Sequence, residues 1–318
     1  MLSVKNIIDT ENLTVADVNL IMENTATFSE VLSRDFKKVP ALRGKTVLNM
    51  FFESSTRTKN SFEIAAKRLG ADTVNFSASG SSLNKGESII DTVKTLQSMI
   101  VDLAIIRHSD SGAINYISSK INIPVINAGD GKHQHPTQAL LDLFTIGESF
   151  AEFKNLKVAI VGDILNSRVA RSNICLFKKM GMDVTLVSAP MLMPVNMDCF
   201  NVKIASCIDD VIEETDVLYM LRMQFERQEK KYYPSIREYN SFFSLDKKRF
   251  MKMKEKSIIM HPGPVNRGIE ISEEVMENED EFIERIKINR QVTNGLAVRM
   301  ALIYLLLASD QLEKEYVH

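Results

Sequence analysis

The chain has 318 residues, of which 45% are hydrophobic and 25% are charged, a profile typical of a soluble globular protein with about two domains. Its formal net charge of −2 gives no support for a nucleic-acid binder, so any cationic site must be local. Three cysteines lack the spacing of metal ligands and are expected to be buried apolar residues in a reducing cytoplasm: Cys175, Cys199 and Cys207.

Neither end of the chain predicts a membrane segment. Residues 1–14 contain no long apolar run, so no secretory signal is expected. The most apolar tract, residues 296–308, is interrupted by Arg299 and reads as too short to cross a bilayer. A buried terminal helix over residues 289–308 is the better interpretation, and no membrane partner is expected.

The first predicted helix, residues 13–32 with Thr10 as its candidate cap, carries no catalytic signal. Residues 46–52 then form an apolar run of strand length, and helical spacing begins at Thr56. Four residues stand at this strand–helix junction: Ser55, Thr56, Arg57 and Thr58. The N–H groups of a helix start, three hydroxyls and a guanidinium suit a tetrahedral phosphate. The alternative is a well-capped helix with a surface arginine.

Two further cations follow in the next part of the chain. After a predicted strand over residues 71–76, a small polar loop contains Ser81, Ser82 and Lys85, which together give a weak second hint of anion binding. A buried strand over residues 101–106 ends at Arg107. Ligands of parallel α/β sheets bind outside the carboxyl ends of strands, so Arg107 is expected at the same edge as the phosphate junction. A surface ion pair is the alternative for Arg107.

His135 and Gln138 bracket a Pro-Thr pair at the start of an amphipathic helix, after a strand over residues 123–127 and a tight turn over 128–131. His135 can donate to a carbonyl oxygen and Gln138 can accept from an amide. The neighbouring His133 raises a metal site as an alternative. No Cys, Asp or Glu completes a plausible ligand set, so substrate recognition is favoured and no metal or cofactor is expected.

A domain boundary is predicted between residues 150 and 151, where polarity rises before a new strand over residues 156–161. The loop from Gly162 to Arg168 resembles the first turn of a Rossmann unit, but the second and third fingerprint glycines are missing. A dinucleotide site is therefore disfavoured, and Arg168 takes the place where a ligand would lie.

The predicted strands continue at α/β spacing over residues 184–188, 202–205, 217–220 and 257–260. The third runs into a long charged loop in which Arg222 and Gln224 alternate, so both can face one ligand while Met223 faces away. The last ends at Pro262, Gly263 and Pro264, a rigid turn that exposes backbone carbonyls.

Five cationic residues stand out, most of them at the predicted ends of strands or helices, and they are more than solvated surface side chains comfortably explain: Arg57, Lys85, Arg107, Arg168 and Arg222. No Ser-His-Asp arrangement, activated cysteine or metal cluster is evident. The pattern therefore indicates substrate orientation and electrostatic stabilisation of an anionic transition state, without a covalent intermediate.

The chain resembles the aspartate/ornithine carbamoyltransferase family, and within it the catalytic chains that act on aspartate. The motifs run in family order from residue 51 to 268: Phe51-Phe52-Glu53 with Ser55-Thr56-Arg57-Thr58, Lys85-Gly86-Glu87, Arg107-His108, Asn127-Ala128-Gly129-Asp130-Gly131, His135-Pro136-Thr137-Gln138, Asp142-Leu143-Phe144-Thr145, Gly162-Asp163, Arg222-Met223-Gln224 and His261-Pro262-Gly263-Pro264.

This resemblance implies an α/β fold of two doubly wound parallel-sheet domains joined by long helices. Residues 1–150, completed by a C-terminal helix over 290–318, would bind carbamoyl phosphate, and residues 151–289 would bind L-aspartate. It also implies a cytoplasmic homotrimer with active sites shared between subunits. A regulatory chain or a dihydroorotase partner is left open.

The resemblance also assigns roles to individual residues. Ser55 to Thr58 and Arg107 would hold the phosphate, and Thr58, Arg107 and His135 would polarise the carbamoyl oxygen. Gln138 and the Pro262 carbonyl, within the Pro262-Gly263-Pro264 turn, would hold the carbamoyl nitrogen. Arg168, Arg222 and Gln224 would bind the carboxylates of aspartate with help from Lys85, which Ser81 or Ser82 accompanies from a neighbouring subunit. The product would be N-carbamoyl-L-aspartate, an early intermediate of pyrimidine synthesis.

Two alternatives remain at this stage. An ornithine-type enzyme would be expected to show His-Cys-Leu-Pro near the last strand and a Ser-Met-Gly loop, where this chain has His261-Pro262-Gly263-Pro264 and Arg222-Met223-Gln224. Paired arginines also suit a dicarboxylate better than a second cation. A non-catalytic anion-binding scaffold is the other alternative, although each motif position that can be matched is filled.

Overall fold

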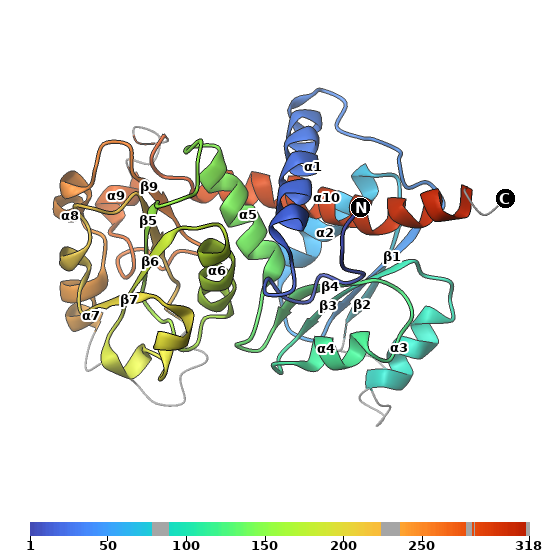
Figure 1. Ribbon diagram of the computed structural model, residues 1–318, viewed down its shortest axis with the longest axis horizontal. Helices are drawn as coiled ribbons and strands as arrows, with labels where there is room; N and C mark the ends of the chain where they lie inside the picture. Colours follow the sequence, from blue (N-terminus) through green and yellow to red (C-terminus); the bar gives the residue numbers. More distant parts are fainter. Residues whose placement is uncertain (78–88, 224–235, 278–281, 283, 316–318) are drawn as a thin grey trace. The chain divides into compact units, whose positions relative to one another are not determined.

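The computed structural model describes residues 1–318 except 78–88, 224–235, 278–281, 283 and 316–318 (Figure 1). The chain divides into two compact units, Met1–Leu141 with Thr293–His318, and Asp142–Val292. Both divisions fall inside helices, α5 (Pro136–Gly147) and α10 (Ile288–Glu315), so these two helices carry the chain between the units. The predicted boundary between residues 150 and 151 lies just beyond the end of α5.

The first unit is built on a parallel four-stranded sheet in the order β2-β1-β3-β4. Its strands are β1 (Thr46–Phe51), β2 (Asp72–Ser77), β3 (Leu103–His108) and β4 (Val125–Asp130). Its remaining helices are α1 (Val15–Ser33), α2 (Thr56–Arg68), α3 (Ile89–Gln97) and α4 (Ala113–Ser118). The chain goes outward from β1 to β2 and returns for β3, so the strand order reverses between β1 and β3.

Helices cover both faces of this sheet, α1 and α2 with α10 on one face and α3 and α4 on the other (Figure 1). Every residue of β4 is buried, as expected for a parallel sheet covered on both sides. The alternate β1 residues Leu48 and Met50 share a buried cluster with Val93 of α3 and Ile114 of α4. The strands therefore read as apolar runs because neither face meets water.

The second unit repeats this plan with a parallel five-stranded sheet in the order β7-β6-β5-β8-β9. Its strands are β5 (Lys157–Val161), β6 (Asp183–Val187), β7 (Lys203–Ala205), β8 (Val217–Met220) and β9 (Ile258–Met260). Its helices are α6 (Arg168–Lys179), α7 (Ile236–Phe243), α8 (Lys247–Lys252) and α9 (Glu273–Glu277), with short 3-10 turns η2 (Pro190–Leu192), η3 (Met197–Phe200) and η4 (Ile208–Asp210). Here the strand order reverses between β5 and β8.

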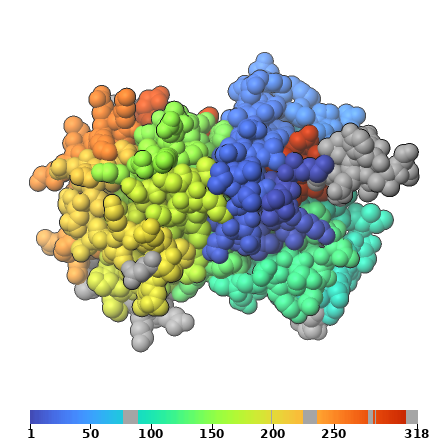
Figure 2. Space-filling view, viewed as in Figure 1, coloured from blue at the N-terminus to red at the C-terminus, as the bar shows by residue number. Residues whose placement is uncertain are grey.

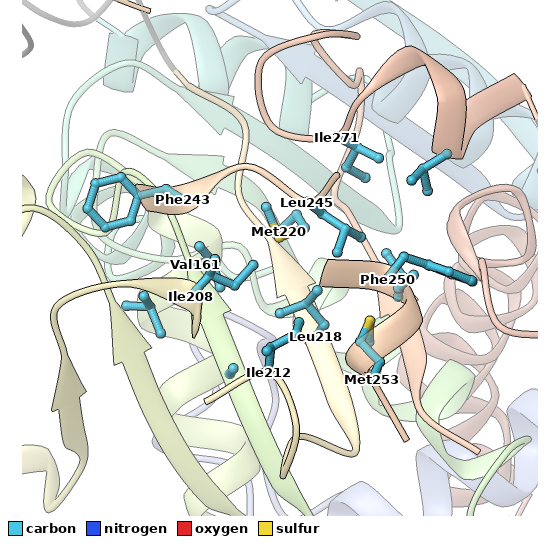
Figure 3. Close-up of a cluster of buried hydrophobic side chains, with 14 of the residues drawn as sticks. Val161, Ile208, Ile212, Leu218, Met220, Phe243, Leu245, Phe250, Met253 and Ile271 are labelled. Carbon is cyan, nitrogen blue, oxygen red and sulfur yellow. The ribbon is translucent and has the colours of Figure 1, made fainter. Parts of the chain in front are cut away.

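A single hydrophobic cluster fills the side of the second sheet that faces α7, α8 and α9 (Figure 3). Val161 of β5 and Met220 of β8 meet Phe243 of α7 and Phe250 of α8 in this cluster. Helix α6 covers the opposite face of the sheet (Figure 1). The sequence prediction of two doubly wound parallel-sheet domains is thus confirmed, and it fixes two reversal points where ligands of such sheets bind.

Two local predictions are wrong at the ends of elements. Helix α1 is capped by Thr14 and not by Thr10, because Asp17 lies three residues after Thr14 and completes a capping box. Strand β4 continues to Asp130 through the predicted turn at 128–131. Its polar side chains are satisfied inside the fold: the Asn127 side-chain amide donates to Asp130 Oδ1 at 2.9 Å, and the Gly129 N–H donates to Asn127 Oδ1 at 2.7 Å.

The cysteines are also less buried than predicted. Cys199 is exposed, and Cys175 and Cys207 are half-buried. All three are free thiols, as expected without a disulfide framework.

Helix α10 is longer than the terminal helix predicted from the sequence. Residues Ile288–Ala308 are long and apolar enough to cross a membrane by length and composition, which corrects the expectation that this tract is too short. Of its most apolar window, 67% is buried inside the protein, as in a core helix of a soluble fold. On the face shown in Figure 2, atoms in the red of the C-terminal residues are visible in small areas.

Candidate functional site

The junction between β1 and α2 lies at the reversal point of the first sheet. Ser55 is the residue before α2, and its side chain makes no capping hydrogen bond to the helix. The first turn of α2 contains no acidic residue, and both Thr56 and Arg57 are exposed while Thr58 is buried. The Ser55 side chain therefore does not occupy the N–H groups of this helix start, and the positive end of the helix dipole there favours an anion.

Arg107 lies beside this junction. It pairs with Phe51 across the β1–β3 ladder, and its backbone carbonyl accepts a hydrogen bond from Phe52 N–H at 2.9 Å. Its guanidinium donates to Ala128 O at 3.2 Å and lies 3.4 Å from Glu53 Oε1. The ion pair considered from the sequence is therefore present, with Glu53, but it is mostly buried, since the Arg107 side chain is only 13% exposed.

A buried aspartate orders the end of β4 and the turn that follows. Asp130 accepts from Gly112 N–H at 2.7 Å, from Gln134 N–H at 3.1 Å and from the ring of His133 at 3.1 Å. Burial alone would raise the pKa of Asp130, but the hydrogen bonds from His133, Asn127 and Gly112 outweigh it and hold the pKa below its usual value. The His133 ring therefore helps to hold the turn through its hydrogen bond to Asp130.

His135 and Gln138 lie at the start of α5, immediately beyond this turn. Both are nearly buried, with 5% and 8% of their surface exposed. The Nδ1 atom of His135 lies 3.5 Å from the hydroxyl of the fully buried Thr137, and the Gln138 N–H donates to the His135 carbonyl at 2.9 Å. Among the described residues, no group of three or more His, Cys, Asp or Glu is placed to hold a metal ion.

The second unit places two arginines at its own reversal point. Arg168 is the first residue of α6, after β5, and only 4% of its surface is exposed. Arg222 is half-buried and follows β8, the neighbouring strand. Strands β5 and β8 run parallel, so both guanidinium-bearing segments leave the same edge of the sheet.

Gly162 allows these two segments to approach closely. Its φ is +124°, and a Cβ atom at this position would lie 3.1 Å from the Tyr239 hydroxyl and 3.2 Å from Leu221. The Leu221 N–H donates to the Val161 carbonyl at 2.8 Å, which aligns the β8 loop with the β5 turn. A residue with a side chain would push apart the loops that carry Arg168 and Arg222.

The turn after β9 is the third part of this edge. Pro262 and Gly263 are half-buried and Pro264 is exposed, and the Gly263–Pro264 bond is cis. The Gly263 N–H donates to the Nδ1 atom of His261 at 2.8 Å. The turn therefore lies next to the Arg222 loop, because β8 and β9 are neighbours in the sheet.

Two buried carboxylates hold the second-unit loops and were given no role from the sequence. Asp142 accepts from Gln291 Nε2 at 2.7 Å and from the Tyr219 hydroxyl at 2.6 Å, and Gln291 in turn accepts from the His261 N–H at 2.9 Å. Glu270 accepts from the Met223 N–H at 2.7 Å. Glu270 stands between Ile269 and Ile271, and this apolar setting was the available sign of burial.

The described residues thus form two groups, each within one unit. The first contains Ser55, Thr56, Arg57, Thr58, Arg107, His135 and Gln138 at the ends of β1, β3 and β4. The second contains Arg168, Arg222, Pro262, Gly263 and Pro264 at the ends of β5, β8 and β9. Ser81, Ser82, Lys85 and Gln224 lie outside the described residues. Phosphate suits the first group and a dicarboxylate suits the second.

Comparison with known families gives matches over both units. Residues 5–148 match the family described as "Aspartate/ornithine carbamoyltransferase, carbamoyl-P binding domain". Residues 154–306 match "Aspartate/ornithine carbamoyltransferase, Asp/Orn binding domain". Together the two matches cover most of the chain.

Similar proteins and structures carry the same description. The aspartate carbamoyltransferase catalytic subunit of Desulfitobacterium hafniense is 48% identical over 303 residues, 95% of this chain and 96% of the relative. A structure of aspartate transcarbamoylase from Trypanosoma cruzi in complex with N-(phosphonacetyl)-L-aspartic acid matches with a TM-score of 0.85, 32% identity and 94% of each chain. The catalytic subunit of M. jannaschii aspartate transcarbamoylase matches with a TM-score of 0.83, 32% identity, and 97% and 99% of the two chains.

Proposed function

This chain belongs to the aspartate/ornithine carbamoyltransferase family, and we propose that it transfers the carbamoyl group of carbamoyl phosphate to the amino group of L-aspartate. The products are N-carbamoyl-L-aspartate and phosphate, in the de novo pyrimidine pathway that leads to UMP. The choice of aspartate over ornithine is carried by Arg168 and Arg222 at the reversal point of the second sheet. Two guanidinium groups attract the carboxylates of aspartate and repel the side-chain ammonium of ornithine.

The first unit is proposed to bind carbamoyl phosphate. The uncapped start of α2 and the guanidinium of Arg107 supply donors for the phosphate oxygens, with Arg57 exposed on the first turn. Thr58, Arg107 and His135 are proposed to polarise the carbamoyl oxygen, and Gln138 to hold the carbamoyl nitrogen together with the Pro262 carbonyl. These donors stabilise the negative charge that develops on the carbonyl oxygen.

The reaction is an acyl transfer to an amine without a covalent enzyme intermediate. The neutral amine of aspartate attacks the carbamoyl carbon and a C–N bond forms, giving a tetrahedral oxyanion. The bond from carbon to the phosphate oxygen then breaks, and phosphate leaves with the electron pair and accepts the proton released by the amine. Fixed cationic and N–H donors lower this barrier by orientation and by stabilising the oxyanion.

A colorimetric assay for ureido products tests this proposal. The purified chain is supplied with carbamoyl phosphate and either L-aspartate or L-ornithine, and product is followed over time. Turnover with aspartate at least about 100-fold faster than with ornithine is expected from charge complementarity alone. Efficient turnover of ornithine would overturn the aspartate assignment, and a folded protein inactive with both would favour a binding scaffold.

We also propose that the chain works as a cytoplasmic homotrimer with shared active sites, into which residues 81–85 of a neighbouring subunit enter. Two relatives described as catalytic subunits support a larger assembly. Native mass spectrometry of the purified chain tests the trimer, and a fully active monomer would contradict it. The same measurement on complexes isolated from cells tests for a regulatory chain or a dihydroorotase partner.

A further inference from the structure

One buried carboxylate ties together the two loops that end β8 and β9. Glu270 has none of its surface exposed, and its carboxylate accepts hydrogen bonds from both of these loops. Oε1 accepts from the Met223 N–H at 2.7 Å and from the Asn266 side-chain amide at 2.7 Å. Oε2 accepts from the Asn266 N–H at 2.7 Å. All three of these groups donate, which is the geometry of an ionised carboxylate.

Glu270 itself is held firmly by its backbone. Its carbonyl accepts from the Leu245 N–H at 2.8 Å, and the next residue, Ile271, is fully buried in the cluster shown in Figure 3. The Ile271 carbonyl also accepts from the Gly268 N–H at 2.8 Å. The carboxylate is therefore a fixed point to which the loops are fastened, since its own main chain is anchored in the core.

The β8 loop is fixed on three sides at Met223. Its side chain is buried in the same hydrophobic cluster, its N–H donates to Glu270, and its carbonyl accepts from the Asn266 side-chain amide at 3.3 Å. Arg222 directly precedes it and is half-buried. Adjacent residues of an extended chain point to opposite sides, so fixing Met223 also fixes the direction in which Arg222 leaves the backbone.

A histidine lies near the carboxylate of Glu270. His261 Nε2 lies 3.9 Å from Glu270 Oε2, beyond hydrogen-bonding distance, and both side chains are fully buried. A carboxylate this deeply buried is retained only where its oxygens are well satisfied, because removing it from water is costly. The three short hydrogen bonds meet that condition, and they all lead to the loops beside the arginines.

We infer that Glu270, acting through Met223 and Asn266, is a positioning residue that sets the placement of Arg222 for the carboxylates of L-aspartate. This inference rests on the proposed function. It assigns no contact between Glu270 and substrate. Recognition of aspartate then depends on Glu270, a carboxylate that does not contact the substrate but orders the loop proposed to bind it.

The Glu270→Gln variant tests the inference directly. The amide keeps the shape of the side chain but turns one oxygen into a donor, which then faces Met223 N–H or the Asn266 donors. We expect KM for L-aspartate and the inhibition constant of succinate, an unreactive dicarboxylate, to rise on the order of 10-fold or more. KM for carbamoyl phosphate should rise less than KM for aspartate, because the donors proposed for its phosphate group lie in the other unit.

Two further variants separate positioning from folding. Asp216→Asn is the matched control: Asp216 accepts from the Lys157 N–H at 2.9 Å and from Lys254 Nζ at 2.7 Å, in the same unit but at the opposite edge of the sheet. It should lower the melting temperature without changing KM for aspartate. Asn266→Ala removes one bridge between the loops. It should also raise KM for aspartate, but by less than Glu270→Gln does. This second variant keeps the test decisive if Glu270→Gln fails to fold.

The outcomes distinguish this inference from the proposed function. If the unmodified protein does not use aspartate, the proposed function fails. If it does, and folded Glu270→Gln and Asn266→Ala both keep the parental KM for aspartate and the parental inhibition by succinate, the positioning role fails alone. A rise in KM that Asp216→Asn reproduces equally would also overturn it, since the effect would then follow from any loss of stability.

Discussion

The two strand–helix junctions at the reversal points present an anion with different donors. Ser55 precedes α2 without a side-chain capping bond, whereas Ser167 caps α6 by accepting from the Ala170 N–H at 3.1 Å. The start of α2 therefore has no cap from its own serine, while α6 satisfies part of its own start and begins at Arg168. Backbone N–H groups suit a tetrahedral phosphate, and a planar guanidinium suits a carboxylate.

At the opposite edges of the two sheets, an aspartate just before β3 and one just before β8 make similar contacts. Asp102 accepts from the Thr46 N–H at 2.8 Å and from Lys45 Nζ at 2.9 Å. Asp216 accepts from the Lys157 N–H at 2.9 Å and from Lys254 Nζ at 2.7 Å in the same relation to β5. One folding plan thus serves twice, and specificity resides in the loops at the carboxyl ends of the strands.

The largest expected effect is at the phosphate junction. Arg57→Ala should remove at least about 3 kcal/mol of transition-state stabilisation, seen as a fall of two or more decades in kcat/KM. Lys67→Ala is the control, because Lys67 is a cation near the far end of the same helix and pairs with Glu63 at 2.6 Å. A near-normal rate in Arg57→Ala would show that the phosphate binds elsewhere and that the α2 junction is not the phosphate site.

Arg222→Ala should affect the second unit selectively. The expected loss is about 2–3 kcal/mol in kcat/KM for aspartate, mainly as a higher KM, because a charge-assisted contact to a carboxylate is removed. Lys247→Ala, which breaks an exposed pair with Glu274, should leave both substrates unaffected. If carbamoyl phosphate saturation suffers as much as aspartate saturation, the division of labour between the two junctions is incorrect.

Substituting the serine before each helix should have a smaller effect. We expect the change before α2 to alter phosphate affinity and the change before α6 to alter stability. Ser55→Asp places a negative charge at the start of α2, so it should weaken phosphate inhibition about 10-fold while leaving the melting temperature unchanged or slightly higher. Ser167→Ala should instead cost about 1 kcal/mol of stability through the lost cap. Titration with phosphate and thermal unfolding measure the two effects. Equal losses of phosphate affinity in both variants would show that capping does not distinguish the junctions.

The sequence predicted the fold well because its strands are covered on both faces and therefore read as apolar runs, and Arg57, Arg107, Arg168 and Arg222 fall just where such runs end. Reversal points follow from strand order, which periodicity does not reveal. The β4 end was misread because Gly129 and Asp130 have turn composition. Hydrogen bonds to distant residues, from the Asn127 side-chain amide to the Ile8 carbonyl and from the Gly112 N–H to Asp130, hold this end of the strand.

The supporting carboxylates were harder to predict than the arginines. Glu270 and Asp142 meet their partners across long separations in the chain, with Met223 and Gln291 respectively. An isolated Glu or Asp in a sequence is normally a solvated residue, so its burial becomes visible only once the strands are placed. Asp142 stands in the motif Asp142-Leu143-Phe144-Thr145 without an evident role, and Glu270 stands in no such motif.

The smallest expected effect is a difference in how the two units respond to acid. Hydrogen bonds lower the pKa of Asp130 below 3.8 despite its burial, whereas burial raises the pKa of Glu270 above 4.5. A lowered pKa contributes stability above the unfolded-state value that is lost as pH falls through the folded-state value. A raised pKa contributes stability at low pH that is lost as pH rises through the folded-state value.

Urea unfolding of Asp130→Asn and Glu270→Gln between about pH 3 and 8 measures these slopes, each at most about 1.4 kcal/mol per pH unit for one proton. The stability deficit of Asp130→Asn relative to the parent should shrink on acidification, because the parent loses its advantage there. The deficit of Glu270→Gln should grow on acidification, because the parent gains stability as Glu270 is protonated. Two deficits that change in parallel with pH would mean that the loop carboxylates of the two units are held in the same way, and that the units differ only at their helix starts.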